Sequence, residues 1–193
     1  MGKGEETRQA VLERGVELSR VIGLEGLSIG RLAEELALSK SGLFAHFRSK
    51  ETLQLEVIQE ARRQFTDRVI APALKKPRGE PRVRALVDLW IEWGAQPGGC
   101  FWVAVTAELD DREGPLRVAA MAAERDWLDM LAQAAQIAVD EGHFVKGLDT
   151  HQFAFELYGL MLGCHFYDRF MRDRAAVPRT RRALNALIER SRR

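Results

Sequence analysis

Three serines close together constrain the local structure that the N-terminal part of this chain can form. Ser28, Ser39 and Ser49 each stand directly before a short run with helical spacing of apolar residues. A serine hydroxyl in this position accepts a hydrogen bond from a free backbone N–H in the first turn of a helix. Residues 28–50 are therefore expected to contain three helix starts with abrupt changes of direction, as a helix-turn-helix requires.

The rest of the chain also has the pattern of helices. No segment alternates apolar and polar residues with the period of a strand, and no Asn-Gly or Asp-Gly pair indicates a hairpin. Further helices are expected at about 6–22, 51–71, 82–94, 100–109, 115–141, 149–172 and after Pro178. We predict an all-α chain with a helix-turn-helix domain at 1–50, a connecting helix at 51–71 and a larger C-terminal domain at 72–193. The first residues of this C-terminal domain, 72–81, are the expected linker.

Charge is distributed unevenly, although the net charge is only +1. Residues 1–71 have 11 basic and 11 acidic side chains, residues 72–168 have a net charge of −6, and residues 169–193 have one of +7. Between Lys40 and Lys50 basic residues occur without any acid. Attraction to DNA phosphates is therefore expected to depend on this local field. The basic C-terminal segment is interpreted as a solvated helix face.

Several other classes of protein have little support. Cys100 and Cys164 form no CxxC pair and the histidines lack metal-ligand spacing, so we expect a reduced, cytoplasmic protein without a metal site. The polar N-terminus does not resemble a signal peptide, and the apolar-rich run at 153–167 is shorter than the roughly 18 residues of a membrane span. Because the chain has no GxSxG elbow, Gly-rich phosphate loop or Glu-x-x-His pair, we expect neither an enzyme nor a cofactor.

The outward face of the helix that begins after Ser39 has the candidate contacts to DNA bases. Lys40 can reach guanine O6 or N7, Ser41 can bond a base or a phosphate, and Ala45 can meet a thymine methyl group. Gly42 allows close approach of the backbone. An ordinary exposed helix surface is the alternative interpretation of the same residues.

Two further residues are candidates for phosphate contacts. His46 and Lys50 lie at the end of this helix and at the start of the next, where the backbone N–H of Lys50 would add to the attraction. For His46, packing between helices is the alternative role.

A motif of two aromatics, a histidine and a capped basic helix start lies at fixed offsets in Leu43-Phe44-Ala45-His46-Phe47-Arg48-Ser49-Lys50-Glu51. This motif resembles the DNA-binding domain of the tetracycline-repressor (TetR) family, and the likeness covers roughly residues 7–60. It implies a homodimer in which each chain has an N-terminal three-helix DNA-binding domain and a larger C-terminal ligand-binding and dimerisation domain. The implied DNA-binding residues are Ser28, Ser39, Lys40, Ser41, Gly42, Phe44, Ala45, His46 and Lys50.

The family's members are usually repressors, so the resemblance implies a ligand-responsive repressor that binds a palindromic operator in double-stranded DNA. A small, apolar or aromatic effector would move the helix at 51–71 and so change the spacing of the two recognition helices. The alternatives are an activator and a DNA-binding protein of the same fold without a ligand.

Two residues depart from the family's usual pattern. Phe44 replaces a tyrosine whose hydroxyl usually reaches a phosphate, so we expect Phe44 to pack instead. Ala37 replaces a turn glycine, and we expect a turn that avoids positive φ, since a Cβ is unfavourable there.

The expected C-terminal domain is rich in large side chains, for which a packed core is the simplest interpretation. Aromatic and methionine side chains from several helices can also line a pocket for an apolar ligand. The candidates for such a pocket are Trp90, Trp93, Phe101, Trp102, Met121, Trp127, Tyr158 and His165.

The segment 153–170 is apolar on almost all sides, so we expect it to be buried on two sides, against a pocket and against a partner subunit. The glycine pair at 159 and 163 would allow another helix to come close. The candidates for the dimer interface are Phe155, Gly159, Leu162, Gly163, Phe166, Leu184, Leu187 and Ile188.

Overall fold

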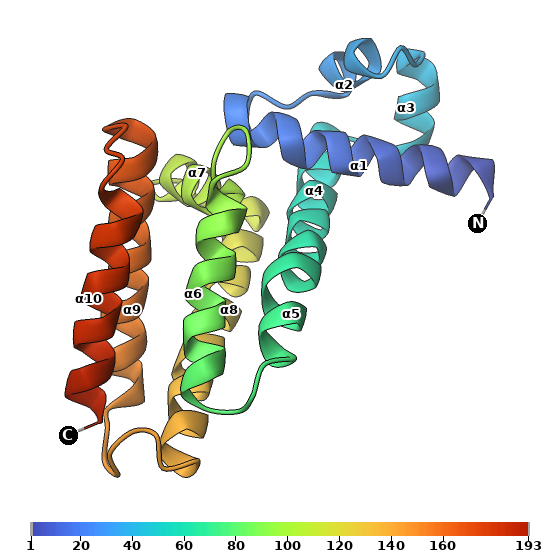
Figure 1. Cartoon of the computed structure of the whole chain (residues 1–193). Helices are drawn as coiled ribbons and strands as arrows, with labels where there is room; N and C mark the ends of the chain where they lie inside the picture. Colours follow the sequence, from blue (N-terminus) through green and yellow to red (C-terminus); the bar gives the residue numbers. More distant parts are fainter. Residues whose placement is uncertain (1, 193) are drawn as a thin grey trace. The chain divides into compact units, whose positions relative to one another are not determined.

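The computed structural model describes residues 2–192 and is helical, with no strand in that range (Figure 1). The predicted all-α class is confirmed. In chain order the elements are α1 (Lys3–Ile22), α2 (Ile29–Glu35), α3 (Lys40–His46), α4 (Lys50–Phe65), η1 (Thr66–Ile70), α5 (Ala71–Leu74), α6 (Glu80–Gly94), α7 (Phe101–Leu109), α8 (Pro115–Asp140), α9 (Thr150–His165), η2 (Phe166–Phe170) and α10 (Ala176–Ser191). The two η elements are π-helices.

The chain packs as two compact units. The first comprises residues 2–64 and 96–123, and the second comprises residues 65–95 and 124–192. The helix α7 and the first turns of α8 therefore pack in the same unit as the N-terminal helices, although the sequence places them in a C-terminal domain. Packing units and functional domains need not coincide, so the domain bounds stay a prediction.

The three predicted serine caps are present in the first unit. Ser28, Ser39 and Ser49 each accept a hydrogen bond from the backbone N–H three residues later, at 3.0 to 3.1 Å. Each cap satisfies one of the N–H groups that the start of a helix leaves free, which fixes the starts of α2, α3 and α4.

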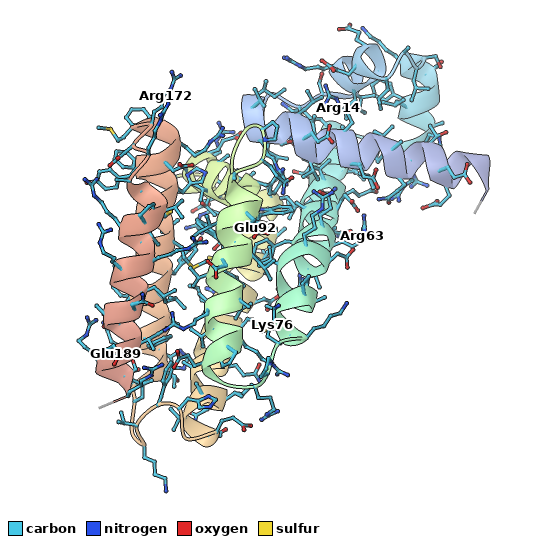
Figure 2. All side chains as sticks on the ribbon, viewed as in Figure 1. Arg14, Arg63, Lys76, Glu92, Arg172 and Glu189 are labelled. Atoms are coloured by element: carbon cyan, nitrogen blue, oxygen red, sulfur yellow. The ribbon has the colours of Figure 1, made fainter. Side chains whose placement is uncertain are left out.

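Helix α1 packs closely on α4 because of a glycine. A Cβ on Gly15 would lie 2.7 Å from Cγ2 of Val57, so a larger residue would push the two helices apart. Figure 2 labels Arg14, which lies on another side of α1. Its guanidinium donates to the Glu35 carboxylate of α2 at 2.7 Å. The fully buried apolar residues of this unit include Val11, Val16, Leu24, Leu27, Leu32, Phe47, Leu53 and Val57.

The turn between α2 and α3 differs from the prediction. Ala37 has φ = +50°, in the left-handed region, so the expectation that it avoids positive φ was wrong. The backbone N–H of Leu38 donates to the carbonyl of Ala33 at 2.9 Å and closes the turn. The geometry of the turn thus prevails over the local preference of alanine.

Helix α4 also continues further than predicted. We expected it to end at Ala71, but the chain stays helical through η1 and α5 to Leu74. The N–H of Ala71 donates to the carbonyl of Thr66, five residues back, in the π-helical hydrogen-bond pattern. Pro72 has no N–H, and its ring crowds the preceding turn of a regular α-helix, so a wider π turn before it lets the helix continue.

In the second unit, α9 packs against α10 and against α6. The predicted cap of α9 is confirmed, because the Asp149 carboxylate accepts the N–H of Gln152 at 2.9 Å. The buried apolar residues that join these helices include Leu86, Phe153, Leu157, Met161, Leu184, Leu187 and Ile188. None of the helices in residues 2–192 is long and apolar enough to cross a membrane.

Candidate functional site

Helix α3 presents a face of small and basic side chains, supported from beneath by two buried residues. Leu43 and Phe47 are at most 1% exposed and anchor the helix to the core of the first unit. The outer side of α3 is exposed and consists of Lys40, Ser41, Gly42, Phe44 and Ala45. A short helix with this surface is of a size that a DNA major groove admits.

Phe44 does not pack as the sequence led us to expect. Its side chain is 55% exposed, because Leu43 and Phe47 occupy the inward positions of this short helix. The expectation of packing was therefore wrong. An exposed apolar ring on this face can contact a thymine methyl group, whereas it cannot donate a hydrogen bond to a phosphate.

The basic residues around α3 have acidic neighbours that the local sequence does not contain. Lys50 donates from Nζ to the Glu25 carbonyl at 2.7 Å and to the Glu25 carboxylate at 2.9 Å. Lys40 Nζ lies 3.8 Å from the Glu34 carboxylate. The interpretation of this segment as free of opposing acids was therefore wrong, because the fold brings in acids from α2 and from the loop before it.

Glu25 is the centre of this charge cluster. Its carboxylate also accepts a hydrogen bond from Arg112 at 2.8 Å. The hydrogen bond from Lys50 and the charges of both cations hold the pKa of Glu25 below its usual value, so the carboxylate stays ionised.

Three other residues predicted to contact DNA also take part in the structure of the first unit, two as helix caps and one as a half-buried side chain. The hydroxyl oxygens of Ser28 and Ser39 each accept the cap hydrogen bond described above, and their O–H groups can still donate to DNA. His46 is half-buried, with its ring centroid 6.3 Å from that of Phe47. The positions of these residues fit DNA contact and a structural role equally, so their part in DNA binding stays a prediction.

The candidate pocket residues are divided between the two units. Phe101, Trp102 and Met121 belong to the first unit, in which the rings of Phe101 and Trp102 meet edge to face at 5.1 Å. The other five belong to the second unit and are Trp90, Trp93, Trp127, Tyr158 and His165.

Within the second unit an aromatic cluster forms around a residue that the sequence analysis did not single out. The ring of Phe65 meets Trp93 at 5.6 Å and Trp127 at 4.9 Å, edge to face in both cases. All three side chains are buried. The indole N–H of Trp127 is also buried and has no hydrogen-bond partner in the described residues. A buried donor of this kind can bind an acceptor group of a ligand.

Glu124 is a second residue that the sequence analysis missed. Its carboxylate accepts a hydrogen bond from the Tyr158 hydroxyl at 2.8 Å, and burial raises the pKa of Glu124 above its ordinary value. The spacing could have revealed it, because Glu124 lies on the same face of α8 as Ala120, Trp127 and Leu131, which are all buried.

His165 is another partly buried polar residue of the second unit. Its ring centroid is 6.3 Å from that of Trp90, and burial, together with the nearby charge of Arg169, lowers the pKa of His165. A neutral imidazole has one donor and one acceptor nitrogen.

Two hollows of the second unit border α9. One of 620 Å³ lies between α8 and α9 and is lined by Tyr158, Phe155 and Leu162 among others. Another of 440 Å³ lies between α9 and α10 and contains Gly159 and Gly163. Residues predicted to form the dimer interface line both hollows.

The predicted dimer surface is only partly available. Leu184, Leu187 and Ile188 are buried within the single chain, on the helix that packs against α9, so they offer almost no surface to a partner. The amphipathic α10 uses its apolar face within the subunit. The remaining candidates lie along α9 and η2, where Phe155 is 74% exposed, and they are Phe155, Gly159, Leu162, Gly163 and Phe166.

The described residues contain no group of three or more His, Cys, Asp or Glu side chains arranged to hold a metal ion.

Comparison with known proteins identifies relatives for both parts of the chain. A family model for bacterial regulatory proteins of the tetR family matches residues 11–57, and a model for the tetracyclin repressor-like C-terminal domain matches residues 79–184. The class C tetracycline repressor protein of Escherichia coli is 41% identical over 54 residues, which are 28% of this chain and 24% of that protein. The chain thus spans about a quarter of this curated relative.

Solved structures have the same fold over nearly the whole chain. A TetR transcriptional regulator from Chloroflexus aurantiacus is 25% identical and has a TM-score of 0.85, with 98% of this chain and 96% of that chain covered. AibR in complex with isovaleryl coenzyme A and operator DNA is 22% identical and has a TM-score of 0.65, with 82% and 85% covered.

Proposed function

Because the chain belongs to the TetR family of bacterial regulatory proteins, we propose that it is a ligand-responsive repressor that binds a palindromic operator as a homodimer. The coarser description, a DNA-binding transcriptional regulator, follows from the family itself. We propose the cytoplasm as its location, because there it would meet bacterial DNA.

The exposed outer face of α3 is the observation that best supports DNA binding. The Ser39 cap and the buried Leu43 and Phe47 hold this helix in one orientation, so the exposed side chains form a preorganised surface. Lys40, whose side chain is 65% exposed, is the best candidate for reading a base. Lys50 is a candidate for holding a phosphate with the donor that Glu25 leaves free.

A salt titration of DNA binding separates these two roles. Lys50→Ala is expected to weaken binding to all duplexes and to reduce the slope of log K against log salt by about one unit. Lys40→Ala is expected to change the preference among operator sequences instead. An unchanged slope in Lys50→Ala would remove this residue from the phosphate contacts.

The exposed apolar side of α9 and η2 supports the homodimer. Phe155 and Phe170 are 74% and 77% exposed in the single chain, and the rings of Phe166 and Phe170 stack at 5.3 Å. Soluble proteins rarely leave such a continuous apolar patch in water. A second copy of the same surface would cover it, and a dimer would then present two copies of α3 to a palindrome.

The effector is proposed to bind the interior of the second unit. The rings of Trp93 and Trp127 offer apolar and aromatic contacts, and Tyr158 and His165 offer polar ones. AibR binds an acyl coenzyme A, but at 22% identity that ligand is a property of AibR and does not define the effector of this chain. A thermal-shift screen of apolar and aromatic compounds tests the proposal, and tryptophan fluorescence should change with each stabilising compound.

An activator of the same fold is the alternative function. A reporter for the regulated promoter distinguishes the two, because deletion of a repressor raises expression of its target. Lower expression after deletion would exclude repression.

A further inference from the structure

The loop that joins α1 to α2, residues 23–27, is held by a side chain from far along the chain. Glu108 of α7 accepts two consecutive backbone N–H groups of this loop. Its Oε2 accepts from Leu24 at 2.7 Å and its Oε1 accepts from Glu25 at 2.6 Å. Hydrogen bonds to an ionised carboxylate are about twice as strong as neutral ones. Glu108 therefore fixes the α1–α2 loop at the point where the chain turns toward α2.

A glycine makes this contact possible. Gly23 has φ = +75°, and a Cβ at this position would lie 2.6 Å from Oε2 of Glu108. Any other residue here would be strained and would displace the carboxylate. The contact between the Glu108 carboxylate and the loop backbone thus depends on a glycine at position 23.

Helix α4 holds the same loop from another side. The buried Gln54 donates to the Leu24 carbonyl at 2.7 Å, and Lys50 donates to the Glu25 carbonyl and carboxylate. Two neighbouring residues of the loop therefore connect α7 to the first two turns of α4, within one compact unit.

Arg112 adds a charge to this connection. It donates to the second carboxylate oxygen of Glu25 at 2.8 Å, so Glu25 is shared between two cations. The three side chains of Glu25, Lys50 and Arg112 together keep a net charge of +1. Lys50 has three N–H donors, of which two are used on Glu25, so one stays available for a phosphate.

We propose that Glu108 is a positioning residue for DNA binding, because it fixes the α1–α2 loop and thereby the place of Glu25 and of the Lys50 ammonium. This inference rests on the proposed function, in which Lys50 contacts a DNA phosphate. Helix α7 then controls a DNA contact without touching DNA itself.

Glu108→Gln tests the inference with little change in size. The amide keeps one acceptor oxygen but turns an NH2 group toward the second backbone N–H, so one of the two hydrogen bonds is lost. Glu113→Gln is the matched control, because Glu113 is an exposed residue of the same region and undergoes the same chemical change. The probe is a fluorescein-labelled duplex selected by the wild-type protein from a random pool.

Three quantities are measured for each variant. They are the Kd for the duplex between about 50 and 200 mM salt, the hydrogen exchange of the Leu24 and Glu25 amides, and the thermal midpoint. Each glutamine variant is also made in the Lys50→Ala background, because a double-mutant cycle isolates the coupling between two residues.

We expect Glu108→Gln to speed exchange of both amides and to weaken DNA binding about fivefold. In the Lys50→Ala background the same change should weaken binding less than about twofold, since the contact that Glu108 positions is already absent. Glu113→Gln should leave exchange and binding unchanged.

A purely structural role predicts a different pattern. An equal loss of binding with and without Lys50, or faster exchange with unchanged binding, would overturn the proposal. If Glu108→Gln does not fold, Glu108→Asp, which keeps the charge but is one methylene shorter, must give a smaller loss with the same dependence on Lys50. Failure of the wild-type protein to select any duplex would instead refute the proposed function.

Discussion

Replacement of Ala37 by glycine is expected to stabilise the protein, because Ala37 adopts φ = +50° in the turn between α2 and α3. An L-residue with a Cβ in the left-handed region costs about 1 to 2 kcal/mol. Glycine removes that cost but loses about 0.5 to 1 kcal/mol more in conformational entropy on folding. Since the Ala37 side chain is exposed, no buried contact is lost with it. The net gain should be about 0.5 to 1 kcal/mol.

Urea unfolding followed by circular dichroism measures this change, with Ala10→Gly as the matched control. Ala10 is an exposed residue inside α1, where the same substitution should cost about 1 kcal/mol. The two variants should therefore shift the midpoint in opposite directions. For a chain of this length the thermal midpoint of Ala37→Gly should rise by about 1 to 4 °C. A midpoint for Ala37→Gly at or below the wild-type value would refute the argument that this turn is strained.

Three more substitutions test separate parts of the structure. Ser39→Ala removes the cap of α3 and should lower the free energy of unfolding by about 1 kcal/mol in urea titrations; no loss would mean that the cap does not hold this helix. Glu124→Gln should stabilise the protein at alkaline pH, because the raised pKa of Glu124 means that the folded state favours the protonated carboxyl group. The stability that the protonated carboxyl group contributes is lost as the pH rises through the folded pKa, whereas glutamine stays neutral. The gain should vanish below the ordinary glutamate pKa of about 4.3, and a gain independent of pH would contradict a buried ionisation. Gly159→Arg should shift size exclusion from dimer to monomer with unchanged circular dichroism, since a Cβ there meets nothing within 4 Å of the single chain; a dimer of unchanged affinity would place the interface elsewhere.

Local chemistry explains which parts of the fold could be predicted from the sequence. The hydroxyls of Ser28, Ser39 and Ser49 act on N–H groups three residues away, so the sequence contains both partners of each cap. The conformation of Ala37 could not be derived in the same way. It depends on how α2 and α3 pack, and that packing prevails over the preference of a single residue.

The electrostatic environment of the candidate site was hidden for a related reason. Glu25 reaches Lys50 from 25 positions away, and Glu108 reaches the backbone of Glu25 from 83 positions away. Neither contact has a periodic pattern in the sequence. A local count of charges therefore shows a basic segment, whereas the folded protein has paired charges around a small exposed face.

Burial within the subunit explains why three of the predicted dimer residues offer almost no surface to a partner. Leu184 and Ile188 lie on an apolar face of α10, and the sequence does not distinguish a face that packs inside the subunit from one that packs on a partner. On α9, by contrast, more apolar surface is present than α6 and α10 can cover, which leaves Phe155 exposed.

The most direct test of the DNA-binding proposal is the ratio of two dissociation constants at one salt concentration. One is for a palindromic duplex selected by the protein, and the other is for a scrambled duplex of the same length and composition. A helix α3 that reads bases predicts a ratio of about 10³ or more in favour of the palindrome, and Lys40→Ala should reduce it. Equal affinities for the two duplexes would contradict sequence recognition by this helix.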